Sequence, residues 1–147
     1  MPCSYEVFAD LDVVKIVFTG STTVREVVDL LDRMDIDPAY HRTIDEILHF
    51  DLIEGNALDP AILKNVSELI RGVMLMNNRS KRMALVARRQ PGRTVAEAFF
   101  DVIARVPELS VRLFDDPLAA LDFLGRSDRR LLLPETRPEN RHQACPS

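Results

Sequence analysis

The sequence reads RMALVA at residues 82–87, TVAE at 94–97 and SVRLFDDPLAALDFL at 110–124. The first of these segments is an apolar run that predicts a strand. Thr94 and Glu97 have the spacing of a capping box, which predicts that a helix begins there. The third segment predicts a second strand and then a second helix. Strands that alternate with helices in this way are typical of a parallel sheet built from βα units.

Turn and cap residues mark the other elements. Asp116 and Pro117 predict the start of a short last helix, and Gly125 predicts its end. Thr23 and Glu26 form another capping box, which predicts the start of the first helix. The predicted strands are Tyr5–Ala9, Val13–Thr19, Ile44–Asp51, Met83–Ala87 and Val111–Phe114, and the first two of them form an antiparallel hairpin.

The second predicted helix starts at Asp59 and Pro60, continues to Met76, and is apolar over an unusually wide face. One apolar stripe is enough to cover a sheet. The other stripe predicts either deep burial or a surface that binds a second copy of the chain, so a homodimer is expected. The candidate dimer face consists of Leu63, Ile70 and Met74.

The composition is that of one soluble globular domain, with 147 residues, 46% of them hydrophobic, and a net charge of −4. A mildly acidic chain is not expected to bind nucleic acid. No apolar run reaches the ~18 residues of a transmembrane helix, and none resembles a signal peptide. Cys3 and Cys145 form no CxxC pair, so we expect no disulfide and a cytoplasmic location.

The composition changes after Gly125, where Arg, Pro, Glu and Asn become frequent. Segments of this kind cannot bury enough apolar surface to fold. We therefore expect an α/β domain over residues 1–125 and a mostly disordered tail over residues 126–147.

The order of these motifs resembles a known family. A GSTT turn at residues 20–23 precedes the first helix, a buried strand ends at Asp51, and the RMALVA strand and the VRLFDDPLAALDFL ending follow. This order resembles the SpoIIAA-like family of small bacterial proteins, which are related in fold to STAS domains. The resemblance covers roughly residues 5–125. It implies a βα superhelix with a five-stranded mixed sheet and four helices, and a non-enzymatic regulatory or protein-interaction module.

The chain departs from the STAS pattern at one functional position. Anti-sigma-factor antagonists with the STAS fold carry a phosphorylatable Ser or Thr just after the third strand. Here Asp51 is followed by LIEGNAL, which contains no hydroxyl residue. The phosphoryl switch is therefore not expected in this protein.

The best candidate for a binding site is the rim beyond the carboxyl ends of the strands, where open α/β sheets bind ligands. Arginines beside a helix N-terminus suggest an anionic ligand or a partner's carboxylate. The alternative interpretation is a solvated turn in which these arginines pair with nearby carboxylates. The rim residues are Ser21, Thr22, Asp51, Glu54, Asn56, Arg88, Arg89 and Arg93.

No residue pattern predicts a catalytic site, a metal site or a cofactor, so we do not expect an enzyme. His49 alternates with Leu48 and Phe50 in a strand, which favours a structural role. Two alternatives stay open. One is a small-molecule or lipid-binding protein, because CRAL-TRIO lipid carriers have a similar superhelix, and the other is an enzyme that uses the carboxylates and arginines of the rim.

Overall fold

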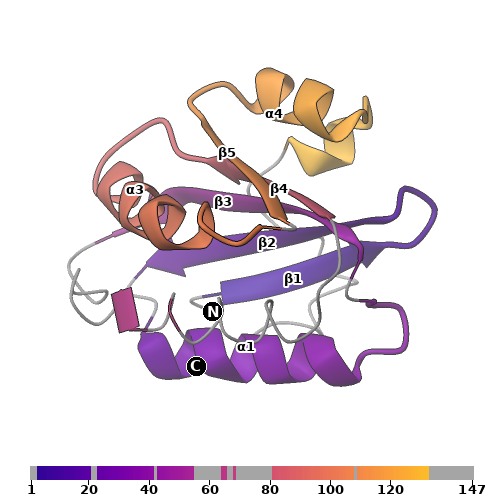
Figure 1. The fold of residues 1–147 in the computed structure, drawn as a ribbon, viewed down its shortest axis with the longest axis horizontal. Helices are drawn as coiled ribbons and strands as arrows, with labels where there is room; N and C mark the ends of the chain where they lie inside the picture. Colours follow the sequence, from indigo (N-terminus) through magenta and orange to yellow (C-terminus); the bar gives the residue numbers. More distant parts are fainter. Residues whose placement is uncertain are drawn as a thin grey trace.

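A computed structural model describes most of the chain around a single β-sheet (Figure 1). The strands are β1 (Cys3–Phe8), β2 (Val13–Gly20), β3 (Asp45–Ile53), β4 (Lys81–Val86) and β5 (Leu109–Phe114). The described residues are 3–20, 23–41, 43–54, 64–65, 68, 81–107 and 109–132.

The strands follow one another across the sheet in the order of the chain. β1 and β2 form an antiparallel hairpin, and the other three pairs of neighbouring strands are parallel. The predicted five-stranded mixed sheet is therefore confirmed. Because β2 to β5 are parallel, their carboxyl ends meet along one rim.

The described residues contain three α-helices, not the predicted four: α1 (Val24–Ile36), α3 (Gly92–Ile103) and α4 (Pro117–Leu124). The helix predicted from Asp59 to Met76 lies almost entirely outside the described residues. Of that segment only Lys64, Asn65 and Glu68 are described, and all three are helical.

The helices cover both faces of the sheet. One hydrophobic core contains side chains of α1 and α3, such as Leu30 and Phe99, packed on sheet residues that include Phe50. A second core lies on the opposite face, where α4 covers Ile47 and its neighbours. In Figure 1, α1 and α4 accordingly lie on opposite sides of the sheet.

Two of the predicted helix caps are confirmed. The Thr23 side chain accepts a hydrogen bond from the backbone N–H of Glu26, at 3.3 Å, and donates one to the Glu26 carboxylate, at 2.8 Å. Asp116 caps α4 by accepting from the backbone N–H of Leu118. Gly125 ends α4 with a φ of 70°, in the left-handed region that glycine tolerates best.

The capping box predicted at Thr94 is wrong, because α3 begins at Gly92, ahead of it. The Gln90 side chain does the capping instead, accepting hydrogen bonds from the backbone N–H and the hydroxyl of Thr94. The early start brings Gly92 against β3. A Cβ at Gly92 would lie 2.0 Å from the carbonyl oxygen of Phe50, so only glycine fits there.

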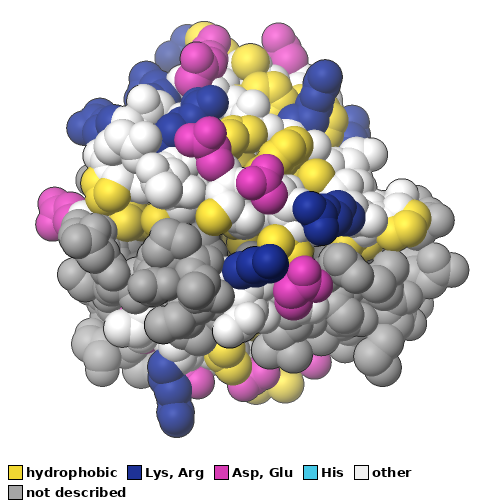
Figure 2. Space-filling view, turned by 60° about the vertical axis from the view of Figure 1, so that its left-hand side comes forward, with side chains coloured by type: hydrophobic (Ala, Val, Ile, Leu, Met, Phe, Trp, Pro, Cys, Tyr) yellow, Lys and Arg dark blue, Asp and Glu magenta, His cyan; other side chains and the backbone are white. Residues whose placement is uncertain are grey.

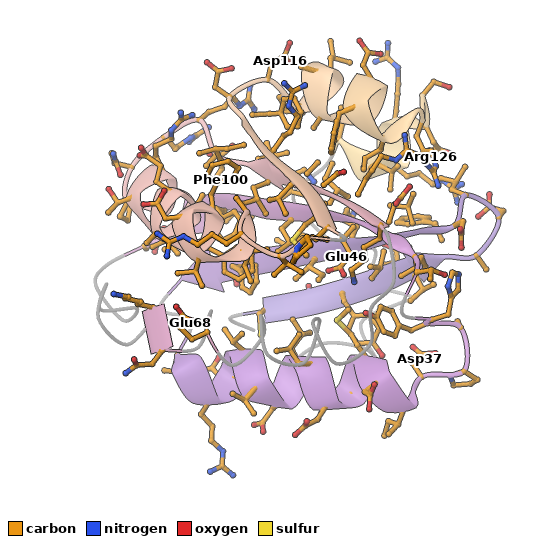
Figure 3. All side chains as sticks on the ribbon, in the orientation of Figure 1. Asp37, Glu46, Glu68, Phe100, Asp116 and Arg126 are labelled. Atoms are coloured by element: carbon orange, nitrogen blue, oxygen red, sulfur yellow. The ribbon has the colours of Figure 1, made fainter. Side chains whose placement is uncertain are left out.

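The folded part of the chain extends beyond the boundary predicted at Gly125. Arg126 forms an ion pair with Asp45, at 2.9 Å, beside the end of α4 (Figure 3). Residues Arg129–Leu131 then form a short 3-10 helix, η1, in which Leu131 is fully buried against the α4 face of the sheet. The burial of Leu131 supplies packing that the composition of residues 126–147 did not predict. Residues 133–147 lie outside the described part.

Cys3 corrects another expectation. It is completely buried on β1 and is disulfide-bonded, whereas we expected no disulfide. Cys145 lies outside the described residues. Among the described helices, none is long and apolar enough to cross a membrane.

Candidate functional site

The rim beyond β3 and β4 is held together by Asp51. Its Oδ1 atom accepts hydrogen bonds from the backbone N–H groups of Arg88, at 2.5 Å, and Arg89, at 3.2 Å. Its Oδ2 atom lies 3.5 Å from Nε of Arg88. The carboxylate therefore organises the turn that leads from β4 to α3. These contacts favour the structural interpretation of Asp51 and Arg88.

The other two rim arginines, Arg93 and Arg89, differ in the contacts that their side chains make. Arg93 donates from Nη1 to the carbonyl oxygen of Ala87, at 3.0 Å, and forms an ion pair with Glu97 one turn further along α3. The Arg89 side chain is exposed. Glu54 contributes its backbone N–H, which donates to the carbonyl oxygen of Gly20 and ties the ends of β3 and β2 together.

The other predicted site residues lie outside the part of the chain that the structure describes. Of the rim, Ser21, Thr22 and Asn56 lie outside the described residues, and so does the whole candidate dimer face of Leu63, Ile70 and Met74. The described part of the rim brings Asp51, Arg88 and Arg89 together, and its carboxylate is already used by the fold.

A cluster of buried ionisable side chains lies on the α4 face of the sheet. Lys15 on β2 is 1% exposed, and its Nζ lies 3.8 Å from Oε1 of Glu6 on β1. The same Nζ donates to the carbonyl oxygen of Arg130, at 3.2 Å. His49 on β3 donates from Nε2 to the carbonyl oxygen of Leu131, at 2.9 Å. Two consecutive carbonyls of η1 thus satisfy two donors of the sheet.

Further contacts hold η1 over this cluster. The guanidinium of Arg130 lies 4.8 Å from the centre of the Phe8 ring and forms ion pairs with Asp10 and Asp128. Burial lowers the pKa of His49 to about 4, although the hydrogen bond to Leu131 opposes that effect. His49 is therefore neutral at physiological pH, and its role is structural, as its position in the strand predicted.

The opposite face carries its own buried pair. Lys81 on β4 donates to the carboxylate of Glu46 on β3, and its Nζ lies 3.5 Å from the hydroxyl of Tyr40. Burial alone would lower the pKa of Lys81, but the charge of Glu46 raises it overall. Figure 3 shows Glu46 within the sheet. This ion pair links two central strands and is enclosed by the fold.

The outer edge of β5 differs from these two buried clusters, because some of its backbone N–H and C=O groups face away from the rest of the sheet. The carbonyl oxygen of Phe114 accepts from the N–H of Ala87, beyond the end of β4, so Phe114 points its backbone groups toward β4. Backbone direction alternates along a strand, so the N–H and C=O groups of Val111 and Leu113 point away from β4. The N–H of Leu109, at the start of the strand, donates to the carbonyl oxygen of Val106. Within the described residues, no strand pairs with this side of β5.

Hydrophobic side chains flank this edge on both faces. Val111 and Leu113 are half-buried on the α3 face, where Phe100 of α3 also packs beside β5 (Figure 3). On the α4 face, Phe114 packs on Phe123, with ring centres 5.6 Å apart. Leu118 at the start of α4 is 59% exposed.

Charged residues lie among the hydrophobic ones on this side of the molecule. Figure 2, in which the α3 side comes forward, shows hydrophobic side chains exposed between basic and acidic ones. At the centre of β5, the exposed Arg112 lies 5.9 Å from the Phe123 ring. Within the part of the chain that the structure describes, the edge of β5 therefore combines the outward backbone groups of Val111 and Leu113 with apolar surface and a positive charge.

Sequence reasoning missed the buried ionisable cluster around Lys15 and the outer edge of β5. The cluster had a signal, because Glu6 and Lys15 are charged residues inside apolar strands, and the hairpin register places them directly opposite each other. The open edge of β5 had none, since strand order is not encoded in any local pattern.

No protein-family model matches the chain, and no match was found among curated proteins or among solved structures.

Proposed function

We propose that the protein is a non-enzymatic regulatory or protein-interaction module that binds an extended segment of a partner protein along β5. The observation that carries the proposal is the outward direction of the backbone groups of Val111 and Leu113. A strand added at a sheet edge satisfies such groups and gains affinity from main-chain hydrogen bonds. The half-buried side chains beside β5 supply the apolar contacts that alternate residues of an added strand need.

The resemblance to the SpoIIAA-like family supports the same class of function, since it implies a regulatory module that acts through protein contacts. Control by phosphorylation just after β3 is not part of the proposal, because residues 52–58 contain no Ser, Thr or Tyr. The proposal therefore places the contact on β5 rather than on the turn that follows β3.

Selection of extended peptides from a displayed library, followed by NMR mapping of the bound peptide, tests the proposal. We expect the bound peptides to shift the amide resonances of Val111 and Leu113. The Val111→Pro variant removes one outward N–H and should abolish binding while the protein stays folded, because proline is tolerated on the open side of an edge strand. Ser110→Ala is the matched control and should bind normally.

The proposal fails if the selected peptides bind elsewhere on the protein. It also fails if the folded Val111→Pro variant binds them as tightly as the original protein does.

A further inference from the structure

We infer that the extended segment bound along β5 is β5 of a second copy of the chain, paired antiparallel about a two-fold axis through Val111. This inference rests on the proposed function, because it names the partner of the same edge. Two-fold pairing is possible only if the strand is complementary to itself. For β5, with the sequence LSVRLF, this depends on which residues lie opposite each other in each register.

Backbone direction and side-chain facing limit the registers. Residues directly opposite each other in an antiparallel pair lie on the same face of the sheet. A two-fold axis near the middle of β5 can therefore pass through Val111, Arg112 or Leu113. In each case the outward groups of Val111 and Leu113 can form hydrogen bonds, so the side chains decide between the registers.

An axis through Arg112 is unfavourable. It would place the two Arg112 side chains directly opposite each other, in a pair without mutual hydrogen bonds, where side chains are closest. Like charges in that position destabilise a strand pair.

An axis through Leu113 is also unfavourable. It would place Val111 opposite Asp115, so an apolar side chain would meet a charged one, and it would place Leu109 opposite Pro117. Proline has no N–H to donate, so that end of the ladder would be incomplete.

An axis through Val111 places neither like charges nor an apolar and a charged side chain opposite each other. Because the N–H of Leu109 already donates to the carbonyl oxygen of Val106, each end of this ladder would have one hydrogen bond, from the N–H of Leu113 to the carbonyl oxygen of Leu109. Val111 then lies opposite its own copy, and Leu109 lies opposite Leu113 twice. These three pairs form one continuous apolar row, made of one buried and two half-buried residues from each chain. On the other face, the exposed Ser110 lies opposite Arg112, so no like charges meet.

The predicted dimer is weak. Each chain contributes a six-residue strand and the side chains beside it, which is less than a standard protein interface contains. A dissociation constant of roughly 10 μM to 1 mM is reasonable for such a contact. The chain is therefore expected to be a monomer when dilute and a dimer when concentrated.

The Ser110–Arg112 pair allows a test that reads the register. Ser110→Glu would create two Glu–Arg pairs across the axis, and Ser110→Arg would create two Arg–Arg pairs. Since one cross-strand pair contributes ~0.2–1 kcal/mol, sedimentation equilibrium should show dimerisation about 2- to 30-fold tighter for Glu and weaker for Arg by a similar factor. The double variant Ser110→Arg with Arg112→Glu should restore tight association.

Control variants separate this effect from net charge. Ile36 is 82% exposed on α1, so Ile36→Glu and Ile36→Arg change the charge by the same amounts away from β5. Both should dimerise like the original protein. Parallel shifts at positions 110 and 36 would show a net-charge effect and overturn the inference.

Two further outcomes are decisive. If the chain stays monomeric at ~1 mM while library peptides still bind along β5, the inference is wrong and the proposed function stands. If the Ser110 variants shift dimerisation as predicted but no peptide binds, the partner is the second copy alone, and the proposed binding of other proteins is wrong.

Discussion

The two outer strands of the sheet, β1 and β5, differ in how far their side chains are buried by the rest of the chain. Four of the six residues of β1 are buried, and Cys3, Ser4 and Glu6 each have further contacts. Only one of the six residues of β5, Leu109, is buried. Natural proteins usually cover or interrupt an edge strand that has no partner, because open edges bind other chains. Among the described residues, β1 is therefore the more enclosed of the two outer strands and β5 the more exposed.

The β1 side of the sheet also contains a buried ion pair, between Lys15 and Glu6. Lys15 and Glu6 are almost completely removed from water, and a buried charge is costly unless it is paired and hydrogen-bonded. The carbonyl oxygen of Arg130 supplies one of the bonds that Lys15 needs. The α4 face beside β1 and β2 is therefore covered by residues that come from both ends of the described chain.

The largest expected effect follows from breaking that buried pair. Lys15→Met leaves the Glu6 carboxylate in an apolar environment without its cation, and should lower the free energy of unfolding by about 3–5 kcal/mol. Urea denaturation at neutral pH measures this. The double variant Lys15→Met with Glu6→Gln should recover most of the loss, because it removes both charges. A small loss in the single variant would show that the β1 side is not stabilised by this pair.

The second prediction compares the same substitution, Leu to Ala, beneath η1 and at the outer edge of β5. Leu131→Ala removes a fully buried side chain and should cost about 2–5 kcal/mol, because a cavity is left in the core beneath η1. Leu113→Ala at the open edge removes a half-buried side chain and should cost clearly less. Equal losses in thermal or urea unfolding would contradict the contrast between the two sides.

The third prediction concerns pH and His49. Its pKa is about 4 in the folded protein and about 6.5 when unfolded. The unfolded chain therefore binds the proton more tightly, so stability is complete above pH ~6.5 and falls as the pH drops toward 4. Between pH 7 and pH 5 the loss from this group should be about 2 kcal/mol.

Urea midpoints at the two pH values measure the loss, and NMR titration of the imidazole measures the pKa directly. His49→Gln retains a donor for Leu131 and should remove most of this pH dependence. An unchanged pH dependence in that variant would show that other groups cause it.

The smallest effect is expected on the rim between the two edges. Arg88 and Arg89 have largely exposed side chains, and an exposed charge contributes ~0–1 kcal/mol. The double variant Arg88→Ala with Arg89→Ala should therefore unfold at nearly the original temperature, since Asp51 still binds the backbone of the turn. Substantial unfolding at room temperature would mean that these side chains are structural.

Much of the fold could be predicted from the sequence because its signals are local. The hairpin, the five individual strands and the caps at Thr23 and Asp116 each depend on residues close together in the chain. The start of α3 was misplaced because Gln90 can cap a helix with its side chain, which the usual pattern of Thr and Glu does not include.

The candidate binding surfaces were harder to predict because they depend on contacts between distant residues. His49 binds a carbonyl that is 82 positions away, and the exposure of β5 among the described residues depends on the order of all five strands. Asp51 was predicted as a rim residue, and its hydrogen bonds to the turn became visible only with the backbone of Arg88 and Arg89 in place. The homodimer through Leu63, Ile70 and Met74 stays a prediction.

The contact between Lys15 and Arg130 also bears on how the protein is made. These residues are 115 positions apart, so the hairpin is synthesised long before Arg130, whose carbonyl oxygen accepts the hydrogen bond from Lys15. Domains generally fold as units during synthesis, and transiently exposed strand edges promote aggregation. In the nascent hairpin, Lys15 can face Glu6 but does not have its contact with the carbonyl oxygen of Arg130 until η1 has been translated. We therefore expect the burial of Lys15 on the α4 face to be complete only when η1 is present.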